Sequence, residues 1–396
     1  MATIREDPGD ELSHFSLIRN DPLFRLQRRI GLIPHKGLGV ARRAVFWSLL
    51  AWLPIAIWAV LTGHWTAPPG SESLPQHFGV NVRCLVAIPL FIIAEGSSHR
   101  LTMSLLPYFE TSGLVRPSDV PRFHGIIGET ARLRDRIYPW IVILAVIIAK
   151  ETLPATSGDA HELVWSSSGN PDAPLGFGGW WYFHVARAIY LTLQLAWLWR
   201  VILLTTLFAR LTQLPLQLVP THPDGAGGLG FVERFLKVFA PVGLATSAVA
   251  SARWAHDVLY HGVAVESIRT GMIALAILLL LIFLAPGLVW IGKLAQTRQQ
   301  ALLDYGALVA THGRLVRHRW IDHERLDDDA ILSAPELGPV ADTAALYEAV
   351  TKMRIVPLGK SALLSLAIPI AIPMLAVIAI QIPIKQILLT LLKTVA

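Results

Sequence analysis

The stretch TGMIALAILLLLIFLAPGLVWIGKL, from Thr270 to Leu294, contains a single charged residue, Lys293. A helix needs about 20 consecutive apolar residues to cross the hydrocarbon core of a bilayer. This run is long enough, so it predicts a membrane-spanning helix. The whole chain has the same bias. Only 16% of its 396 residues are charged and its mean hydropathy is +0.51, whereas about a quarter of the residues of a soluble domain are charged.

Six further runs of this kind predict the rest of the fold. We expect an all-α protein, a polytopic membrane helix bundle of about seven transmembrane helices with a small helical cytoplasmic subdomain. No internal repeat is visible in the sequence, so the inverted-repeat class of transporters is not favoured. The other six expected spans are Ala44–Gly63, Val80–Glu95, Ile137–Leu153, Trp180–Leu203, Phe235–Trp254 and Leu358–Ile382.

The distribution of Lys and Arg predicts the orientation of these spans. Most of these residues lie in the segment before the first run and in the loops after the second, fourth and sixth runs. The alternate loops hold only Lys150, Arg253 and Arg269, all at the edges of spans. Because loops rich in Lys and Arg stay on the cytoplasmic side, we expect a cytoplasmic N-terminus. The pI of about 9.6 then reflects topology, and no nucleic-acid partner is expected.

The runs divide the chain into four segments. Residues 1–43 form a cytoplasmic N-terminal segment, and residues 44–294 hold six transmembrane helices with their loops, one of which carries an interfacial helix. Residues 295–357 are a cytoplasmic helical segment, whose last helix is expected to be N-capped by Asp342. This segment either forms the subdomain or lies flat on the membrane. Residues 358–396 form the last transmembrane helix and an amphipathic tail.

Two prolines, Pro369 and Pro373, make the last span unusual. Each proline removes a backbone hydrogen bond and favours a kink in the helix. A full span puts the tail outside, whereas a re-entrant hairpin would return Lys385 and Lys393 to the cytoplasm. We favour the full span, and both prolines are candidate residues of a pathway or its gate.

Charged residues inside the expected spans are further candidates for a pathway. Glu95 and His99 are four positions apart, so they share a helix face, and Arg200 of the fourth span can reach them. Arg187 lies deep in the fourth span and needs a partner or water, for which Glu151 is a candidate. These groups form either a gated or proton-linked pathway or structural ion pairs near an interface. The second interpretation is the simpler one.

No metal ion or cofactor is expected from the sequence. His256, Asp257 and His261 are close along the chain, but histidines at positions i and i+5 are poorly aligned on a helix. The single cysteine, Cys84, excludes an internal disulfide and a cysteine-based metal site. The sequence has no Walker loop, no GxSxG motif and no dinucleotide fingerprint, which disfavours an enzyme without excluding one.

The stretch PTHPDGAGGLGF, residues 220–231, follows the fourth span on the expected cytoplasmic side. Pro223 stops the helix, and Asp224 with the glycines favours a tight turn with positive φ angles. A new helix is expected to begin near Leu229. Free N–H groups at a helix start bind anions, so this turn is either a phosphate or lipid-headgroup site or a plain helix–turn–helix corner. The candidate binding residues are His222, Asp224, Gly225, Gly227 and Gly228.

Two motifs carry a resemblance to a known group of proteins. THPDGAGGLGF, the later YEAVTKMRIVP and the Leu-rich tail with its two prolines resemble a family of bacterial multi-pass inner-membrane proteins of unassigned activity. The resemblance covers most of the chain. It implies a bacterial inner-membrane location and makes residues 220–231 a family hallmark, but it implies no catalytic residues. In topology alone the chain is similar to insect chemoreceptor-type channels, without a shared residue motif.

These features lead to three hypotheses for function. The leading one is an inner-membrane channel or transporter for an ion or small solute, with membrane lipids and further copies of the chain as candidate partners. The second is a membrane enzyme acting on a lipid or phosphorylated substrate, with His222 as the acid–base group and Asp224 orienting it. The third is a sensor or assembly protein whose cytoplasmic helices bind another protein.

Overall fold

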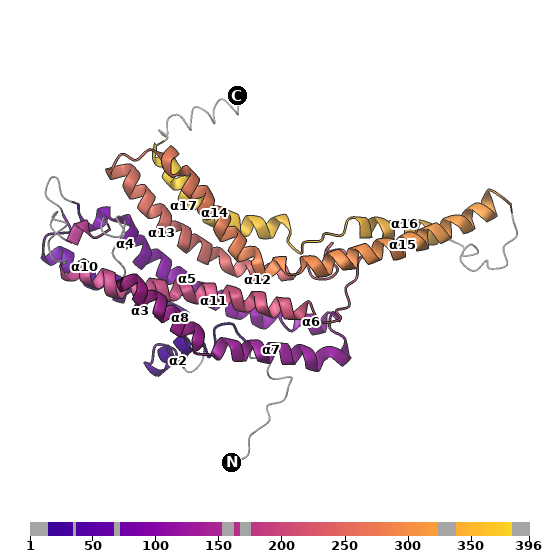
Figure 1. The fold of residues 1–396 in the computed structure, drawn as a ribbon, viewed down its shortest axis with the longest axis horizontal. Coiled ribbons are helices and arrows are strands. Elements are labelled where there is room, and N and C mark those ends of the chain that lie inside the picture. Colours follow the sequence, from indigo (N-terminus) through magenta and orange to yellow (C-terminus); the bar gives the residue numbers. More distant parts are fainter. Residues whose placement is uncertain are drawn as a thin grey trace, which may run out of the picture.

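The computed structural model describes residues 15–34, 37–66, 72–152, 162–166, 176–323 and 338–381. Every regular element in these ranges is a helix (Figure 1). Six of the described helices are long and apolar enough to cross a membrane, which confirms the all-α membrane bundle. They are Val40–Leu61 (α3), Phe78–Thr111 (α4 to α6), Phe177–Leu211 (α10 and α11), Val232–Tyr260 (α12 and α13), Val265–Leu288 (α14) and Lys360–Gln381 (α17).

Two of these spans are much longer than their apolar runs predict. Phe78–Thr111 has 34 residues and Phe177–Leu211 has 35, so each rises about 50 Å at 1.5 Å per residue. The polar residues that end each apolar run do not end the helix, because their side chains are compatible with helical backbone. Regular α-helix ends at Leu105 in the first span, two residues before Pro107, and at Leu211 in the second, four residues before Pro215. A proline cannot continue the hydrogen-bond ladder.

The third expected span is a shorter helix, α8 (Tyr138–Thr152), of 15 residues. Only Ile143 is buried in the protein, and its neighbours such as Val142 and Leu144 are more than half exposed. α8 lies along α11 at the edge of the bundle. The part of the chain that the structure describes therefore has six helices of full spanning length and one apolar helix that falls short of it.

Three of the six long spans are assembled from shorter pieces that pack on a common core. α4 (Phe78–Val82) and α5 (Ile88–Leu105) are joined by a π-helical segment, Arg83–Ala87. α10 (Phe177–Trp181) and α11 (Arg187–Leu211) are likewise joined by a π-helical segment, Tyr182–Ala186. The remaining pieces are α6 (Tyr108–Thr111), α12 (Val232–Leu236) and α13 (Ala240–Tyr260), with a 3₁₀ turn at Lys237–Phe239 between the last two.

The bundle has two distinct ends. At the first, which we call the Tyr260 end, α13 and α10 have their termini; in Figure 1 it is at the left. At the second, which we call the α15 end, buried aromatic rings close the core between α6, α11 and α12. The ring centroids of Phe208 lie 5.4 Å from Phe235 and 5.7 Å from Trp290. This aromatic core fixes the helices at the α15 end, because large buried rings contribute strongly to packing.

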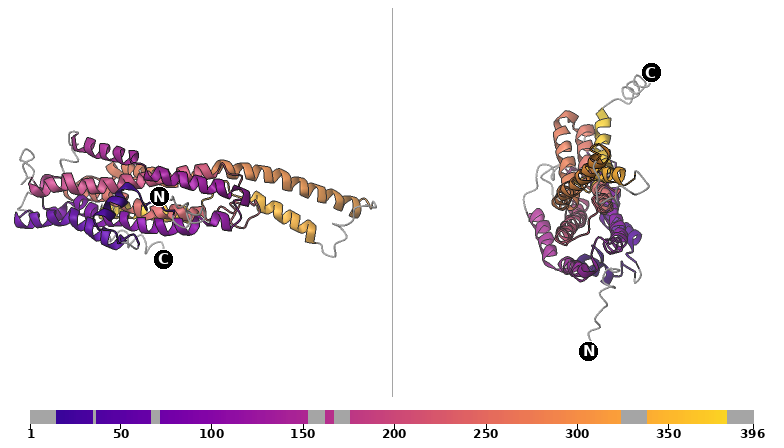
Figure 2. Two further views of the ribbon diagram at one scale, coloured as in Figure 1. Left: turned by 90° about the horizontal axis from the view of Figure 1, so that it is seen from below. Right: turned by 90° about the vertical axis from the view of Figure 1, so that its right-hand side faces the viewer.

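A long arm extends from the α15 end. α15 (Ile291–Trp320) continues from α14 after a turn at Val289, and α16 (Gly338–Thr351) runs alongside it (Figure 2). Residues 295–357 were expected to be helical, and the described part of this segment is helical in α15 and α16. The prediction that Asp342 caps the next helix is wrong, because α16 begins at Gly338 and Asp342 lies inside it.

The segments before α3 and α8 cover one side of the bundle. α2 (Pro22–Arg29) precedes α3, and α7 (Val120–Asp135) packs on α11 through a buried stripe that includes Phe123 and Ile127. The side chain of Arg134 is also buried and donates a hydrogen bond to the backbone oxygen of Ser16. A helix is thus present where one was expected in this loop, and it holds the N-terminal segment against the bundle.

Candidate functional site

A buried ionic cluster ties three spanning helices together. Glu95 lies within α5 with no exposed surface. Its Oε2 is 2.6 Å from Nη2 of Arg43 on α3, and its Oε1 is 2.8 Å from Nη2 of Arg200 on α11. The prediction that Arg200 reaches Glu95 is confirmed, whereas Arg43 is a partner that sequence reasoning did not identify.

The segment before α3 completes this cluster. Asp21 lies 3.2 Å from Arg200 through its Oδ2, and its Oδ1 accepts a 2.6 Å hydrogen bond from the N–H of Phe24 at the start of α2. Burial raises the pKa of the Asp21 carboxyl above its ordinary value, with Arg200 opposing that shift. Gln27 accepts a hydrogen bond from Nε of Arg43.

The ionic cluster therefore holds two cations and two anions, all at most 4% exposed. A buried ion is stable only when its charge is compensated, and removing one partner of such a pair typically costs about 3–5 kcal/mol. The guanidinium of Arg200 also lies 4.9 Å from the ring centre of Trp197. These contacts make the level of Glu95 a buried, charge-balanced layer that joins α3, α5 and α11 to the start of α2.

The other candidate charges inside the spans do not belong to this layer. Among the described residues, the buried Nδ1 of His99 has no hydrogen-bond partner. Arg187 lies 4.9 Å above the ring of Phe183. Glu151, expected as a partner for Arg187, lies 2.6 Å from Nδ1 of His184.

Nearer the Tyr260 end, a second charged group involves both π-helical segments. Arg83, the first residue of one, pairs with Glu162 at 3.0 and 3.3 Å. Tyr182, the first residue of the other, donates a 2.8 Å hydrogen bond to the same carboxylate. The guanidinium of Arg83 lies 5.5 Å from the ring of Tyr182. Short π-helical segments inside α-helices are frequent at functional sites, and here two of them meet.

This group borders a cavity of about 430 Å³ between α11, α13 and α14, lined by both charged and apolar side chains, which we call the polar cavity for its charged residues. Arg253 and Asp257 line it one turn apart on α13, so their side chains share a helix face. Within the part of the chain that the structure describes, neither side chain makes an ion pair. Gln194 and Thr246 line its deeper part, and Thr246 lies about 21 Å from the end of α13 at 1.5 Å per residue.

The cavity and the ionic cluster lie at different levels of the bundle. Arg83 and Glu95 are twelve positions apart on one continuous helix, a rise of about 18 Å. The cavity belongs to the Tyr260 end, and the ionic cluster lies between it and the α15 end. In the sequence Arg253 is only the edge of a span, and nothing local marks Glu162, a loop residue that folds over a helix end.

The predicted turn at residues 220–231 is organised around Asp224. Its Oδ1 accepts hydrogen bonds from the N–H of Ala226 (2.7 Å) and Gly228 (3.2 Å), and its Oδ2 accepts one from Gly230 (2.8 Å). Partial burial alone would raise the pKa of Asp224, but these donors, with His222, hold it below its ordinary value. Nδ1 of His222 lies 2.9 Å from Oδ1 of Asp224.

The glycines of this turn serve its backbone geometry. Gly225, Gly227 and Gly228 have φ angles of 63°, 66° and 94°, which other residues adopt only with strain. The following helix begins at Val232, so the prediction of a start near Leu229 is wrong by three residues. The reason is that the left-handed residues and the carboxylate of Asp224 extend the turn.

The two motifs that carry the family resemblance contact each other. Nη2 of Arg354 donates a 2.7 Å hydrogen bond to the backbone oxygen of Asp224, and its own N–H donates one of 2.7 Å to Gly225. The N–H of Gly359, just before α17, donates to Glu233 of α12 at 3.0 Å. The turn therefore anchors the start of the last span. A phosphate or headgroup at this turn would have to replace Asp224, which already holds the donors that an anion needs.

Pro369 and Pro373 lie inside α17, which is one continuous helix from Lys360 to Gln381. α17 packs chiefly along α13, and Pro373 lines an apolar cavity of about 420 Å³ between α4, α13 and α17. The amphipathic tail predicted after this span lies outside the described residues. Comparisons with known proteins add no further constraint: no protein-family model, no curated protein and no solved structure matches the chain.

Proposed function

We propose that this protein transports a small charged solute across the membrane and binds it in the polar cavity at the Tyr260 end. The observation that carries the proposal is the pair Arg253 and Asp257, which face a cavity among spanning helices without an ion pair to each other or to another described residue. Charges inside a membrane bundle are costly, and they commonly mark substrate or ion pathways.

The composition of the cavity indicates the class of solute. Arg253 offers a guanidinium to an anionic group, and Asp257 offers a carboxylate to a cationic group. Gln194 and Tyr190 add neutral hydrogen-bonding groups. A volume of about 430 Å³ falls within the range of small-molecule sites. A small anion or a zwitterion such as an amino acid fits this set of groups.

The ionic cluster supplies the closed side of the proposed pathway. Under the positive-inside expectation the Tyr260 end faces outward in a bacterial inner membrane, since its loops are poor in Lys and Arg. The cavity then opens outward, and the layer of Glu95, Arg43 and Arg200 separates it from the cytoplasmic side. Transport requires this layer to rearrange, and α17, anchored by the turn at residues 220–231, is the proposed moving element.

The proposal is tested by uptake into liposomes containing the purified full-length protein. Four tracers cover the candidate solutes: potassium, chloride, phosphate and glycine. We expect uptake of at least one of them above empty liposomes. Arg253→Gln should reduce that uptake about tenfold or more, because one charge-assisted hydrogen bond contributes about 1.5–3 kcal/mol. Arg269→Gln, at the same end but outside the cavity, is the matched control and should leave uptake unchanged.

A second candidate function is a sensor or assembly protein, and the arm of α15 and α16 favours it. The arm extends beyond the bundle and exposes Leu303, Leu308 and Leu346. Exposed apolar side chains on a projecting element suit a protein–protein contact. Purification under mild conditions, followed by identification of bound chains, tests this candidate, and recovery of this chain alone would count against it.

A further inference from the structure

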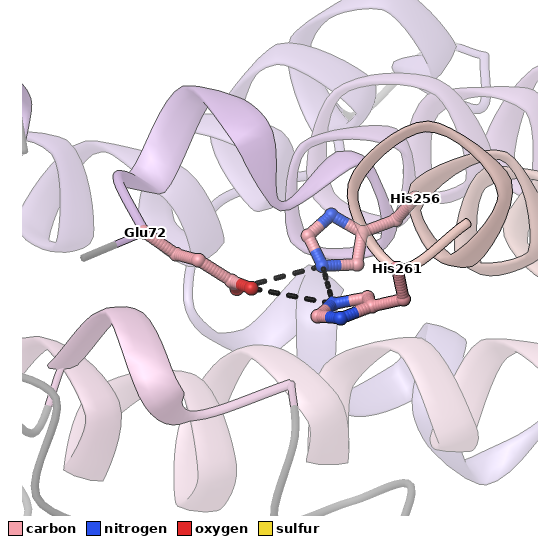
Figure 3. Close-up of side chains that lie close together, drawn as sticks. All are labelled: Glu72, His256 and His261. Atoms are coloured by element: carbon pink, nitrogen blue, oxygen red, sulfur yellow. Dashed lines mark hydrogen bonds and ion pairs between the residues drawn. The ribbon is translucent and has the colours of Figure 1, made fainter. Parts of the chain in front are cut away.

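Three side chains with metal-ligating atoms converge at the Tyr260 end, outside the cavity described above. Glu72 comes from the segment between α3 and the 3₁₀ turn Leu74–Gln76, and His256 and His261 come from the end of α13. Figure 3 shows the two imidazole rings directed towards the carboxylate of Glu72. Segments almost 190 positions apart in the chain thus place one oxygen and two nitrogens together.

The end of α13 explains how the two histidines meet. On an uninterrupted helix, positions i and i+5 diverge, which is why the sequence disfavoured a metal site. α13 ends at Tyr260, and His261 leaves the helix with φ −111° and ψ 5°. The Nε2 atoms of His256 and His261 are therefore only 3.4 Å apart. The spacing argument against their convergence is wrong, because it assumed a helix that continues.

The separations match the edges of a tetrahedral coordination sphere. Oε1 of Glu72 lies 3.2 Å from Nε2 of His261, and Oε2 lies 3.5 Å from Nε2 of His256. Zinc binds histidine nitrogen and carboxylate oxygen at about 2.0–2.2 Å. Ligand atoms at the corners of a tetrahedron with such bonds are about 3.3–3.6 Å apart. The two imidazole nitrogens, and the carboxylate with one oxygen towards each of them, are thus close enough for one ion to reach all three side chains.

Neighbouring groups orient these ligands as in known metal sites. Nδ1 of His256 lies 2.9 Å from the backbone oxygen of Gln76, so an N–H there leaves the lone pair on Nε2. Nε2 of His77 lies 2.7 Å from Oε2 of Glu72, and the His77 ring stacks on His256 at 4.7 Å. Metal-binding histidines and carboxylates usually have such outer partners, which fix tautomer and direction.

Exposure differs across the three ligands in a way that permits entry of an ion. The side chain of His256 is 5% exposed, that of Glu72 is 21% exposed and that of His261 is 37% exposed. His256 and Glu72 are the more buried ligands, and His261 lies on the side that is open to solvent. Two imidazoles and one carboxylate favour zinc and neighbouring transition metals, whereas calcium and magnesium prefer sites made of oxygen ligands.

We propose that Glu72, His256 and His261 bind a divalent transition-metal ion, zinc being the ion that best fits the ligand set. Three protein ligands leave a fourth position for water or another ligand. The bound ion would join the end of α13 to the segment before α4. Asp257, which lines the polar cavity, follows His256 in the chain. This inference does not depend on what the cavity binds.

The test uses the untagged full-length protein in detergent, freed of metal with a chelator and titrated with zinc against a fluorescent zinc indicator. We expect one zinc ion per chain, and a higher thermal unfolding temperature with zinc because the ion binds the folded state. Calcium should give neither effect. His77→Ala should weaken zinc binding by about 10- to 100-fold, as loss of an outer partner does.

Two ligand variants and one control complete the experiment. Glu72→Gln and His261→Ala should each abolish stoichiometric zinc binding, while their unfolding temperatures without metal stay close to that of the wild type. His184→Ala, a half-exposed histidine at the same end, should bind zinc as the wild type does. Folded wild-type protein that takes up no zinc, or equal zinc binding by the wild type and both ligand variants, would overturn the proposal.

Discussion

Replacing Glu95 by Gln is the sharpest test of the buried ionic cluster. The substitution keeps the shape of the side chain and removes one of two anions that compensate Arg43 and Arg200, at 2.6 and 2.8 Å. Because all three side chains are at most 2% exposed, water cannot replace the lost charge. We expect the free energy of unfolding to fall by about 3–5 kcal/mol, the usual cost of leaving a buried ion unpaired.

This loss translates into a measurable change in unfolding temperature. The entropy of unfolding is about 2.1 cal/mol/K per residue, or about 0.8 kcal/mol/K for a chain of this length. Glu95→Gln should therefore lower the midpoint by about 4–6 °C. The assay is thermal unfolding in detergent followed by intrinsic fluorescence, for which the chain has 13 tryptophans.

A matched control variant separates the effect of losing a buried carboxylate from the effect of losing an exposed one. Glu129→Gln removes a carboxylate that pairs with Arg210 at 2.7 Å, but both side chains are exposed, so the expected loss is below about 1 kcal/mol. The double variant Arg43→Gln with Glu95→Gln restores the charge balance and should cost less than the sum of the single variants. Equal shifts for Glu95→Gln and Glu129→Gln, or strict additivity in the double variant, would refute the account of the ionic cluster.

Two further outcomes are expected at the α15 end and in the last span. Asp224→Asn should destabilise the turn by about 1–3 kcal/mol and speed amide hydrogen exchange in residues 220–231. Because its N–H donors lower the pKa of Asp224, its contribution is complete above the ordinary value of 3.8 and is lost as the pH falls through the lower folded-state pKa. A difference from wild type that persists unchanged in acid would contradict this. Replacing Pro369 and Pro373 together by Ala should alter solute flux while α17 still forms. Unaltered flux in this double variant would exclude α17 as the moving element.

Much of the fold could be predicted from hydropathy alone, because lipid demands long apolar runs. The residues at which the helices begin and end could not be predicted in this way, because a polar residue ends an apolar run without ending a helix. The second run, Val80–Glu95, is thus part of the helix Phe78–Thr111. In the Ile137–Leu153 run, in contrast, the helix described is the 15 residues Tyr138–Thr152, and Pro139 is its second residue.

The site was less predictable, because it depends on contacts between distant segments. Helical spacing correctly placed Glu95 within reach of Arg200, since both lie on long helices. No periodicity connects Asp21 or Arg43 to them. Asp21 lies before the first span and Arg43 lies on another helix, and tertiary packing alone brings them to Glu95 and Arg200. His261 illustrates a different limit: its position depends on where α13 ends, and a shift of one residue would move its ring away from Glu72.

The measurement that tests the transport proposal most directly is solute flux before and after chemical modification of the cavity. A cysteine in place of Gln194, in the deep part of the cavity, would be treated with a charged, membrane-impermeant thiol reagent. The native Cys84 is fully buried and serves as the unreactive background, and Ser267→Cys supplies an exposed site outside the cavity. We expect modification at position 194 to block flux and modification at position 267 to leave it unchanged. Undiminished flux through a protein fully modified at position 194 would show that the solute does not pass through this cavity.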